Sequence, residues 1–176
     1  EQVCAAVKAG GFGHRQVVIR VNGPETPWGA DDMAAAAKAG ADAILLPKPN
    51  TAADIDRASA AMRQAGAPET TVLWAMMETP LAILNAKEIA GAAKHAGSRL
   101  TCLVLGTNDL VKETRAQLDG ERTAALFWLQ ASVTAARAFG LTVLDGVYNN
   151  FKDLAGLERE CLHGRRLGFD GKTLIH

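Results

Sequence analysis

Two carboxylates stand at the ends of apolar runs, where packing alone would favour apolar side chains. Glu78 follows the run VLWAMM at residues 72–77, and Asp109 follows the run LTCLVL at residues 100–105. If these runs are neighbouring strands, the two carboxylates converge, and they repel each other unless they share a proton or a cation. A divalent cation held by two carboxylates, with its other positions left to water and substrate, is the usual magnesium arrangement. The alternative is that Glu78 and Asp109 only cap the helices that begin in ETP and TNDL.

Arg20 is the basic residue of greatest chemical interest, because it lies inside the run VVIRV at residues 17–21. A guanidinium there must find an anion, since desolvation without one is costly. Its planar fork suits a carboxylate or an enolate oxygen. We therefore expect Arg20 to contact such an anion. The open alternative is an internal salt bridge to Glu78 or Asp145.

Polar residues follow the other apolar runs as well. In a barrel of parallel strands, residues at the C-terminal strand ends point into the active site. Asn108, beside Asp109, and His176 are expected to bind substrate, although a lone histidine at a strand end is more often structural. Lys48, in LLPKP, could equally pair with a neighbouring acid. The strand-end set is Arg20, Asn22, Lys48, Glu78, Asn108, Asp109, Asp145 and His176.

Six short β-rich runs must position these residues. None alternates polar with apolar residues, so each is expected to be covered on both faces, as parallel strands are. Alanine-rich helical patterns lie between them, which predicts repeated βα units. The β-rich runs are residues 17–21, 43–46, 72–77, 100–105, 141–144 and 172–175. The helical patterns are residues 29–39, 52–65, 80–96, 122–139 and 153–167.

Repeated βα units without a GxGxxG motif favour a (β/α)8 barrel over a dinucleotide-binding sheet. Gly40, Gly140 and Gly168 fit the left-handed position that closes a helix before the next strand. Six units are two short of eight. We therefore expect residues 1–176 to form one partial TIM-barrel domain whose first two strands would precede Glu1.

The overall composition excludes several classes of partner. Nineteen basic and nineteen acidic residues leave no net charge, which argues against nucleic acid or an anionic membrane as the main partner. The sequence lacks an apolar run long enough to span a membrane. Its three cysteines are widely spaced and without a CxxC pair, so reduced thiols in a cytoplasmic protein are expected. Cys102 is expected to pack inside a strand.

Six motifs, in order along the chain, resemble one family. They are VVIRVNGPETPWGADD, ADAILLPK, METP, LGTNDL, DGVYNNFKD and LGFDGKTLIH. Together they resemble the citrate lyase β-subunit-like acyl-CoA lyases, which include malyl-CoA, citramalyl-CoA and citryl-CoA lyases and are related to the HpcH/HpaI aldolases. The resemblance implies a TIM barrel with Mg2+ on Glu78 and Asp109 and with Arg20 against the substrate. It also places the LIH ending, with His176, near the acyl-CoA site.

The activity implied by this resemblance is magnesium-dependent cleavage of a 3-hydroxyacyl-CoA into acetyl-CoA and a 2-oxo acid. The family also implies a homo-oligomer, a trimer or a hexamer. Family members carry an upstream DLEDA-like strand end and a C-terminal segment that covers a neighbouring subunit's site, and neither is present in these 176 residues. The resemblance therefore does not imply that residues 1–176 alone are active. The alternatives are an HpaI-type pyruvate aldolase without CoA, and a non-catalytic homologue that serves as a subunit.

Overall fold

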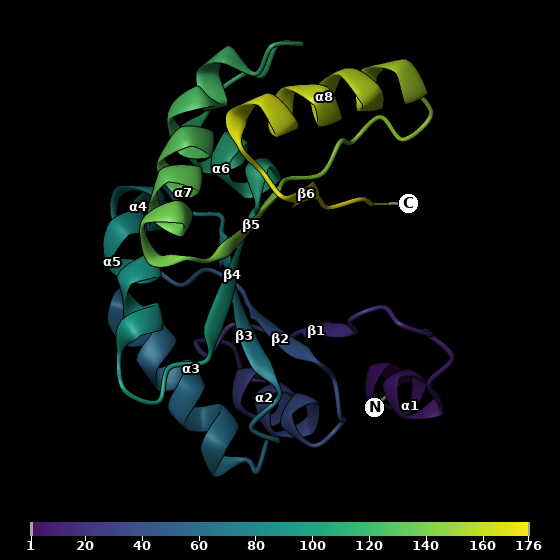
Figure 1. The fold of residues 1–176 in the computed structure, drawn as a ribbon, viewed down its shortest axis with the longest axis vertical. Coiled ribbons are helices and arrows are strands. Elements are labelled where there is room, and N and C mark those ends of the chain that lie inside the picture. The colour runs from purple at the N-terminus through teal and green to yellow at the C-terminus, as the bar shows by residue number, and fades with distance from the viewer. Residues whose placement is uncertain (1, 176) are drawn as a thin grey trace.

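The computed structural model describes residues 2–175, in which six parallel strands form one sheet in chain order. The sheet curves into a half-barrel with helices on its convex side (Figure 1). The strands are β1 (Val18–Arg20), β2 (Ala43–Leu46), β3 (Val72–Met77), β4 (Leu100–Leu105), β5 (Thr142–Asp145) and β6 (Gly171–Lys172). The α-helices are α1 (Gln2–Ala9), α2 (Gly29–Ala37), α3 (Ala52–Gln64), α4 (Pro80–Leu84), α5 (Ala86–Gly91), α6 (Thr107–Thr114), α7 (Leu126–Phe139) and α8 (Leu154–Leu167). Two 3-10 helices are η1 (Ala92–Lys94) and η2 (Thr123–Ala125).

The two faces of the sheet are in different environments. In β3, Leu73, Ala75 and Met77 are fully buried against the convex layer of helices, whereas Trp74 and Met76 point to the concave side and are half-buried. The prediction that every strand is covered on both faces is therefore wrong for β3. The concave side carries a smaller apolar cluster of its own. Its members are Val18, Leu45, Trp74, Met76, Cys102, Val104 and Leu144.

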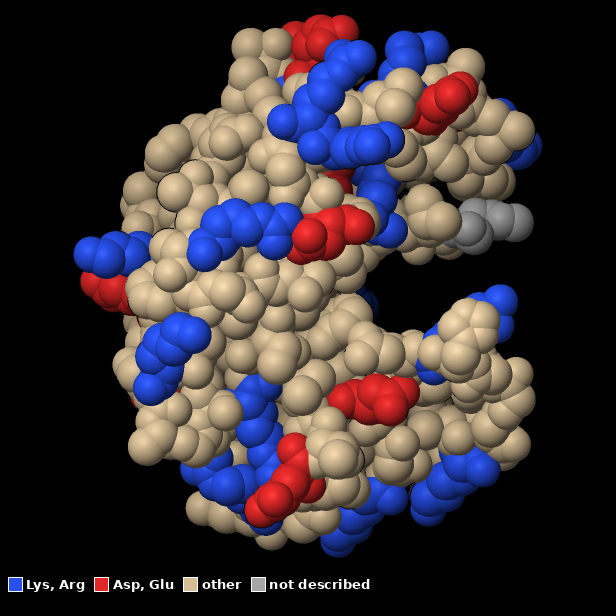
Figure 2. Space-filling view, viewed as in Figure 1, with Lys and Arg blue, Asp and Glu red and all other residues tan. Residues whose placement is uncertain are grey.

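The open side of the half-barrel is visible in space-filling form. Figure 2 shows it as a notch, with β6 and the segment after it above and α1 below. Both ends of the drawn chain lie toward this side (Figure 1). The strand order places β1 and β6 at the two edges of the sheet, where each has one neighbour.

The element boundaries follow local signals that can be read in the sequence. Thr79 begins α4, because its side chain accepts a hydrogen bond from the Ala82 N–H at 3.0 Å and Pro80 is preset for a first helical turn. Gly140 and Gly168 end α7 and α8 with φ values of 75° and 100°, as expected for left-handed closing positions. The Thr79 cap follows the C-terminal end of β3, whereas Gly140 and Gly168 lie before the N-terminal ends of β5 and β6.

The observed elements differ from the predicted ones in three places. Strands β2, β3 and β4 have the predicted bounds, while β1 and β6 are shorter than the runs that predicted them. Helix α6, which begins directly after β4, was not predicted. The pattern over residues 80–96 is broken at Asn85 into α4 and α5, followed by η1. The missed helix carries two of the predicted site residues.

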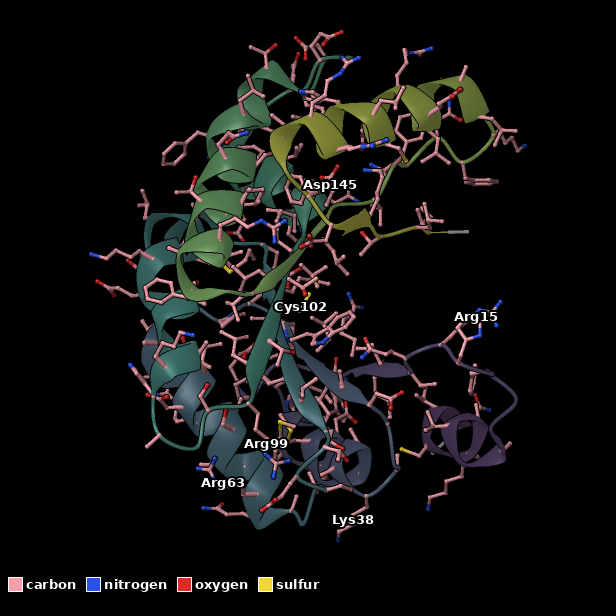
Figure 3. All side chains as sticks on the ribbon, in the orientation of Figure 1. Arg15, Lys38, Arg63, Arg99, Cys102 and Asp145 are labelled. Carbon is pink, nitrogen blue, oxygen red and sulfur yellow. The ribbon has the colours of Figure 1, made fainter. Side chains whose placement is uncertain are left out.

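Two further sequence expectations concern cysteines and membranes. All three cysteines are free thiols, and Cys102 is buried in β4, where burial raises the pKa of its thiol to about 12 (Figure 3). In residues 2–175, no helix combines the length and the apolar character that crossing a bilayer requires.

Candidate active site

Glu78 lies at the C-terminal end of β3 and is almost completely buried, with 4% of its surface exposed. It continues the series Val72, Trp74 and Met76, so alternation along the strand directs it toward the concave side. The neighbouring Gly106 at the end of β4 leaves room for it, because an added Cβ at Gly106 would overlap the Cβ of Glu78. The alternation of side chains along β3 sets the direction of Glu78, and the absence of a Cβ at Gly106 leaves space for it.

Asp109 reaches the same mouth from the first turn of α6, directly after β4. The prediction had placed Asn108 and Asp109 at a strand end, and the structure corrects this to a helix N-terminus. An acid in the first turn is favoured by the helix dipole. Since β3 and β4 are paired neighbours, the two carboxylates open into the same region, as the sequence predicted.

The charges around Glu78 confirm that these groups interact. Burial raises the pKa of Glu78, and the negative charge of Asp109 raises it further. The backbone N–H of Lys48, which donates to Glu78 Oε1 at 3.1 Å, and the positive charges of Lys48 and Arg20 lower it in part. The net pKa is above the ordinary value of a glutamate. One electrostatic site is thus formed by four residues: Arg20 of β1, Lys48 after β2, Glu78 after β3 and Asp109 of α6.

Lys48 is the residue whose part in this site was underestimated from the sequence. Its ammonium lies 3.4 Å from Asp109 Oδ1 and 3.7 Å from Glu113 Oε1. Burial lowers the pKa of Lys48, but the hydrogen bond and charge of Asp109, with Glu78 and Glu113, outweigh burial and raise it overall. Its backbone has φ 49°, an uncommon left-handed conformation for a side chain of this size. The Pro-Lys-Pro sequence was the available signal for an unusual backbone here.

Arg20 is exposed on β1, on the same face as Val18 of the concave cluster. The ion pairs found within residues 2–175 do not include Arg20, so the structure gives no support to a salt bridge with Glu78 or Asp145. Its charge nevertheless acts on Glu78. The guanidinium is therefore available to an anion in the mouth.

Three other predicted site residues have different surroundings. Asn108 and Asn149 exchange two side-chain hydrogen bonds, of 3.0 and 2.8 Å, which tie α6 to the loop after β5. Asn22 donates through its backbone and its amide to Asp32 in the first turn of α2, at 3.1 and 2.7 Å. His176 lies outside the described residues.

Asp145 does not point into the mouth, which corrects the expectation for β5. It shares the face of Val143, the helix-covered one, and lies 1% exposed beneath α8 (Figure 3). Arg122 Nη1 donates to both of its carboxylate oxygens at 2.8 Å, and Lys172 Nζ lies 3.2 Å away. Gly164 permits this approach, because an added Cβ would lie 2.8 Å from Asp145 Oδ2. Asp145 is thus part of a buried ionic cluster that joins β5, β6 and α8.

A cavity of about 630 Å3 lies next to the acidic site, between α2, α3 and the loop after β2. Apolar side chains such as Met33, Leu46 and Ala58 line much of it, and Lys48 and Thr79 stand at its border with the mouth. Glu78 and Asp109 are not among its lining residues, so the cavity adjoins the acidic pair without containing it.

The donor set is compatible with magnesium. In the part of the chain that the structure describes, no group of three or more histidine, cysteine or acidic side chains is arranged to hold a metal. Glu78, directly after β3, and Asp109, in the first turn of α6, do match a hard cation that keeps several positions for water and substrate. Burial first, and then the negative charge of Asp109, raise the pKa of Glu78.

Comparison with known proteins identifies the family. The sequence profile of the HpcH/HpaI aldolase/citrate lyase family matches residues 1–176. The chain belongs to this family. Among curated relatives, a protein named (3S)-malyl-CoA thioesterase from Cereibacter sphaeroides is 50% identical over 165 residues, which cover 94% of this chain and 54% of the relative. Citrate lyase subunit beta of Escherichia coli is 38% identical over 166 residues, covering 92% of this chain and 54% of that protein.

Solved structures of HpcH/HpaI aldolase/citrate lyase relatives share the fold. The citrate lyase beta subunit of M. tuberculosis, solved with oxaloacetate and magnesium, is 26% identical with a TM-score of 0.72, covering 90% of this chain and 67% of that chain. RipC of Yersinia pestis is 25% identical with a TM-score of 0.80, covering 90% and 70%. The chain spans about half the length of the curated relatives it matches.

Proposed function

We propose that this chain supplies the metal-binding half of a magnesium-dependent lyase that cleaves a 3-hydroxyacyl-CoA into acetyl-CoA and a 2-oxo acid. The observation that carries the proposal is the buried Glu78 at the end of β3, with Asp109 of the first turn of α6 beside it and acting on its charge. Burial and a neighbouring acid both disfavour the ionised form of a carboxylate, and a bound cation favours that form. The M. tuberculosis relative solved with magnesium and oxaloacetate supports the choice of metal and of substrate class.

Each residue has a distinct part in this reaction. Glu78 and Asp109 would hold Mg2+, which when bound polarises the keto oxygen of the 2-oxo acid product or its hydroxyl precursor. Arg20 would face the oxygen on which negative charge develops as the acetyl-CoA enolate forms, and so stabilise it. The Lys48 N–H holds Glu78 in place through Oε1. The general base is not assigned to any of these residues.

A second candidate is thioester hydrolysis, because a relative with 50% identity is named (3S)-malyl-CoA thioesterase. Hydrolysis of malyl-CoA attacks the thioester carbonyl and releases CoA and malate. The lyase reaction instead breaks the carbon–carbon bond and leaves the thioester intact in acetyl-CoA. The two reactions need the same substrate but stabilise charge on different atoms.

The test is to follow both sets of products from malyl-CoA, with citramalyl-CoA and citryl-CoA as further substrates. The intact protein that contains this chain is incubated with each thioester and Mg2+. A lyase releases a 2-oxo acid, trapped as its phenylhydrazone, without free thiol at early times. Free CoA thiol without 2-oxo acid would instead assign the thioesterase reaction and overturn the lyase proposal.

Two remaining alternatives are tested in the same experiment. Release of pyruvate from a 4-hydroxy-2-oxo acid without CoA would indicate an HpaI-type aldolase. Absence of turnover with all of these substrates, together with absence of Mg2+ binding, would indicate a non-catalytic subunit. We also propose that the intact protein is a cytoplasmic homo-oligomer, for which sedimentation analysis gives the subunit number.

A further inference from the structure

Lys48 contacts both acids, one through its backbone and the other through its side chain. The backbone N–H donates to Glu78 Oε1 at 3.1 Å, while the side chain turns to Asp109 Oδ1 at 3.4 Å. One residue therefore contacts both members of the acidic pair. The double contact is made with a Lys48 φ of 49°, between Pro47 and Pro49.

A second acceptor for the ammonium stands one helical turn beyond Asp109. Glu113 Oε1 lies 3.7 Å from Lys48 Nζ, and Glu113 is four residues after Asp109 on α6. Residues spaced by four lie on the same face of a helix. The ammonium can thus shift along α6 from one carboxylate to the other without leaving the mouth. The three side chains are each about two-fifths exposed, so none is locked in place by packing.

We propose that Lys48 is the internal counter-ion of the Glu78–Asp109 pair in the metal-free protein, and that a divalent cation displaces its ammonium from Asp109 toward Glu113. The inference rests on the metal site proposed above and adds a residue that controls its affinity. A lysine ammonium and Mg2+ compete for the same oxygen, because each needs its negative charge. Lys48 therefore weakens metal binding but keeps the two acids from repelling each other when the metal is away.

The side-chain role predicts that removal of the charge tightens metal binding. Lys48→Asn removes the ammonium and keeps a residue that tolerates a left-handed backbone. We expect this variant of the intact protein to bind Mg2+ about two- to fivefold more tightly at low ionic strength, the range of a partly exposed ion pair. Lys48→Arg keeps a competing cation and should bind Mg2+ no more tightly than wild type. Isothermal titration calorimetry with MgCl2 measures both.

A matched control separates this contact from the general charge of the mouth. Lys112 is exposed on α6, and its side chain takes part in none of the ion pairs or side-chain hydrogen bonds found within residues 2–175. Lys112→Asn removes a like charge from α6, the helix that carries Asp109 and Glu113, and should leave Mg2+ affinity within about 1.5-fold of wild type. Equal or weaker Mg2+ binding by Lys48→Asn, or an equal gain in Lys112→Asn, would overturn the proposal. A purely structural Lys48 predicts weaker binding.

The part of Glu113 is tested by a double-mutant cycle. If Glu113 receives the displaced ammonium, Glu113→Gln should weaken Mg2+ binding in wild type and have a smaller effect in the Lys48→Asn background. Identical effects in both backgrounds would show that Glu113 acts only through its own charge and would overturn its role as acceptor.

Thermal unfolding without metal distinguishes failure of this inference from failure of the proposed function. In EDTA, Lys48→Asn should lower Tm, and the loss should be smaller in an Asp109→Asn background, where no second anion needs the ammonium. Wild type that does not bind Mg2+ would remove the proposed function and the displacement together, while the coupling in EDTA would still decide the counter-ion role. Wild type that binds Mg2+ without any effect of Lys48→Asn would overturn the inference alone.

Discussion

At the scale of single residues, Glu78 combines a function with a cost in stability. Burial and the charge of Asp109 raise the pKa of Glu78, so the folded state favours the protonated carboxyl group and is destabilised when Glu78 ionises. The contribution to stability is present below the ordinary pKa of 4.5 and is lost as pH rises through the raised value. At a pH above this raised pKa, the metal-free protein therefore carries an unfavourable charge at this position.

Replacement of that carboxylate should separate binding from stability. Glu78→Gln keeps an oxygen for the Lys48 N–H but has no charge to hold a hard cation. We expect Mg2+ affinity to fall at least about tenfold and the metal-free Tm to rise. A gain of about 1 kcal/mol corresponds to roughly 2–4 °C for a domain of this size. Calorimetry and thermal unfolding in EDTA check the two effects, and a lower Tm would contradict the stated cause.

The titration of Glu78 should also depend on its neighbour. Asp109 is the second cause of the raised pKa, after burial, so Asp109→Asn should move the pKa of Glu78 down toward its ordinary value. Mg2+ requires the ionised carboxylate, so wild-type affinity should fall with decreasing pH, beginning at a higher pH than for an ordinary glutamate. Carboxyl 13C NMR of the metal-free protein follows the titration. An unchanged pKa in Asp109→Asn would show that the two acids do not interact.

Arg20 provides the prediction that separates catalysis from metal binding. Arg20→Lys keeps the charge but loses the planar fork that holds two oxygens. If Arg20 stabilises the developing enolate, kcat should fall by about 10- to 100-fold with a smaller change in KM, while Mg2+ affinity stays constant. Steady-state kinetics and calorimetry on the intact protein check this. Activity equal to wild type would exclude Arg20 as the anion clamp.

At the scale of elements, the ionic cluster around Asp145 holds β5 and β6 together through charged side chains. Arg122 is 2% exposed with φ 54°, and it joins the segment before α7 to β5. Removal of one partner leaves a buried charge, so Arg122→Met should lower the free energy of unfolding by about 3–5 kcal/mol. Arg57→Met, which breaks the exposed pair with Asp54 on α3, should cost no more than about 0.5 kcal/mol. Denaturant unfolding of the two variants compares them, and similar losses would contradict a buried anchor.

The same elements show how far sequence reasoning reached. Strands β2 to β4 were predicted correctly because long apolar runs there end at Pro47, Glu78 and Gly106. Glu78 and Asp145 both end such runs, yet they face opposite sides of the sheet. The difference is one of phase: Glu78 is out of step with Met77 and the other helix-covered residues of β3, whereas Asp145 is in step with Val143.

What could not be predicted depends on contacts between distant segments. Arg122 lies 23 residues before Asp145, at the start of the helical pattern predicted over residues 122–139, and nothing local marks it as a partner of Asp145. Helix α6 is short and was hidden by the assumption that Asn108 and Asp109 stand at a strand end, although a cap in TNDL was the open alternative for Asp109. The role of Lys48 required its φ value, which the two flanking prolines suggest but do not determine.

At the scale of the whole molecule, the concave face is an apolar surface with limited cover in residues 2–175. Val18, Trp74, Met76 and Leu144 are only partly buried there, and β1 and β6 are open edges of the sheet. Partly covered apolar surface and unpaired strand edges both favour association with another chain. The concave side, which opens at the notch in Figure 2, is thus a surface that favours association.

Residues 1–176 produced alone should therefore self-associate as concentration rises, as measured by sedimentation velocity. Trp74→Thr reduces the apolar area of the concave face and keeps a good strand former, so it should shift the chain toward monomer. Trp28→Thr is the control, since Trp28 is 62% exposed in the loop before α2 and lies outside the concave cluster. A wild-type chain that stays monomeric and melts cooperatively would show that the half-barrel is stable without cover. Equal effects of the two tryptophan variants would place the association surface elsewhere.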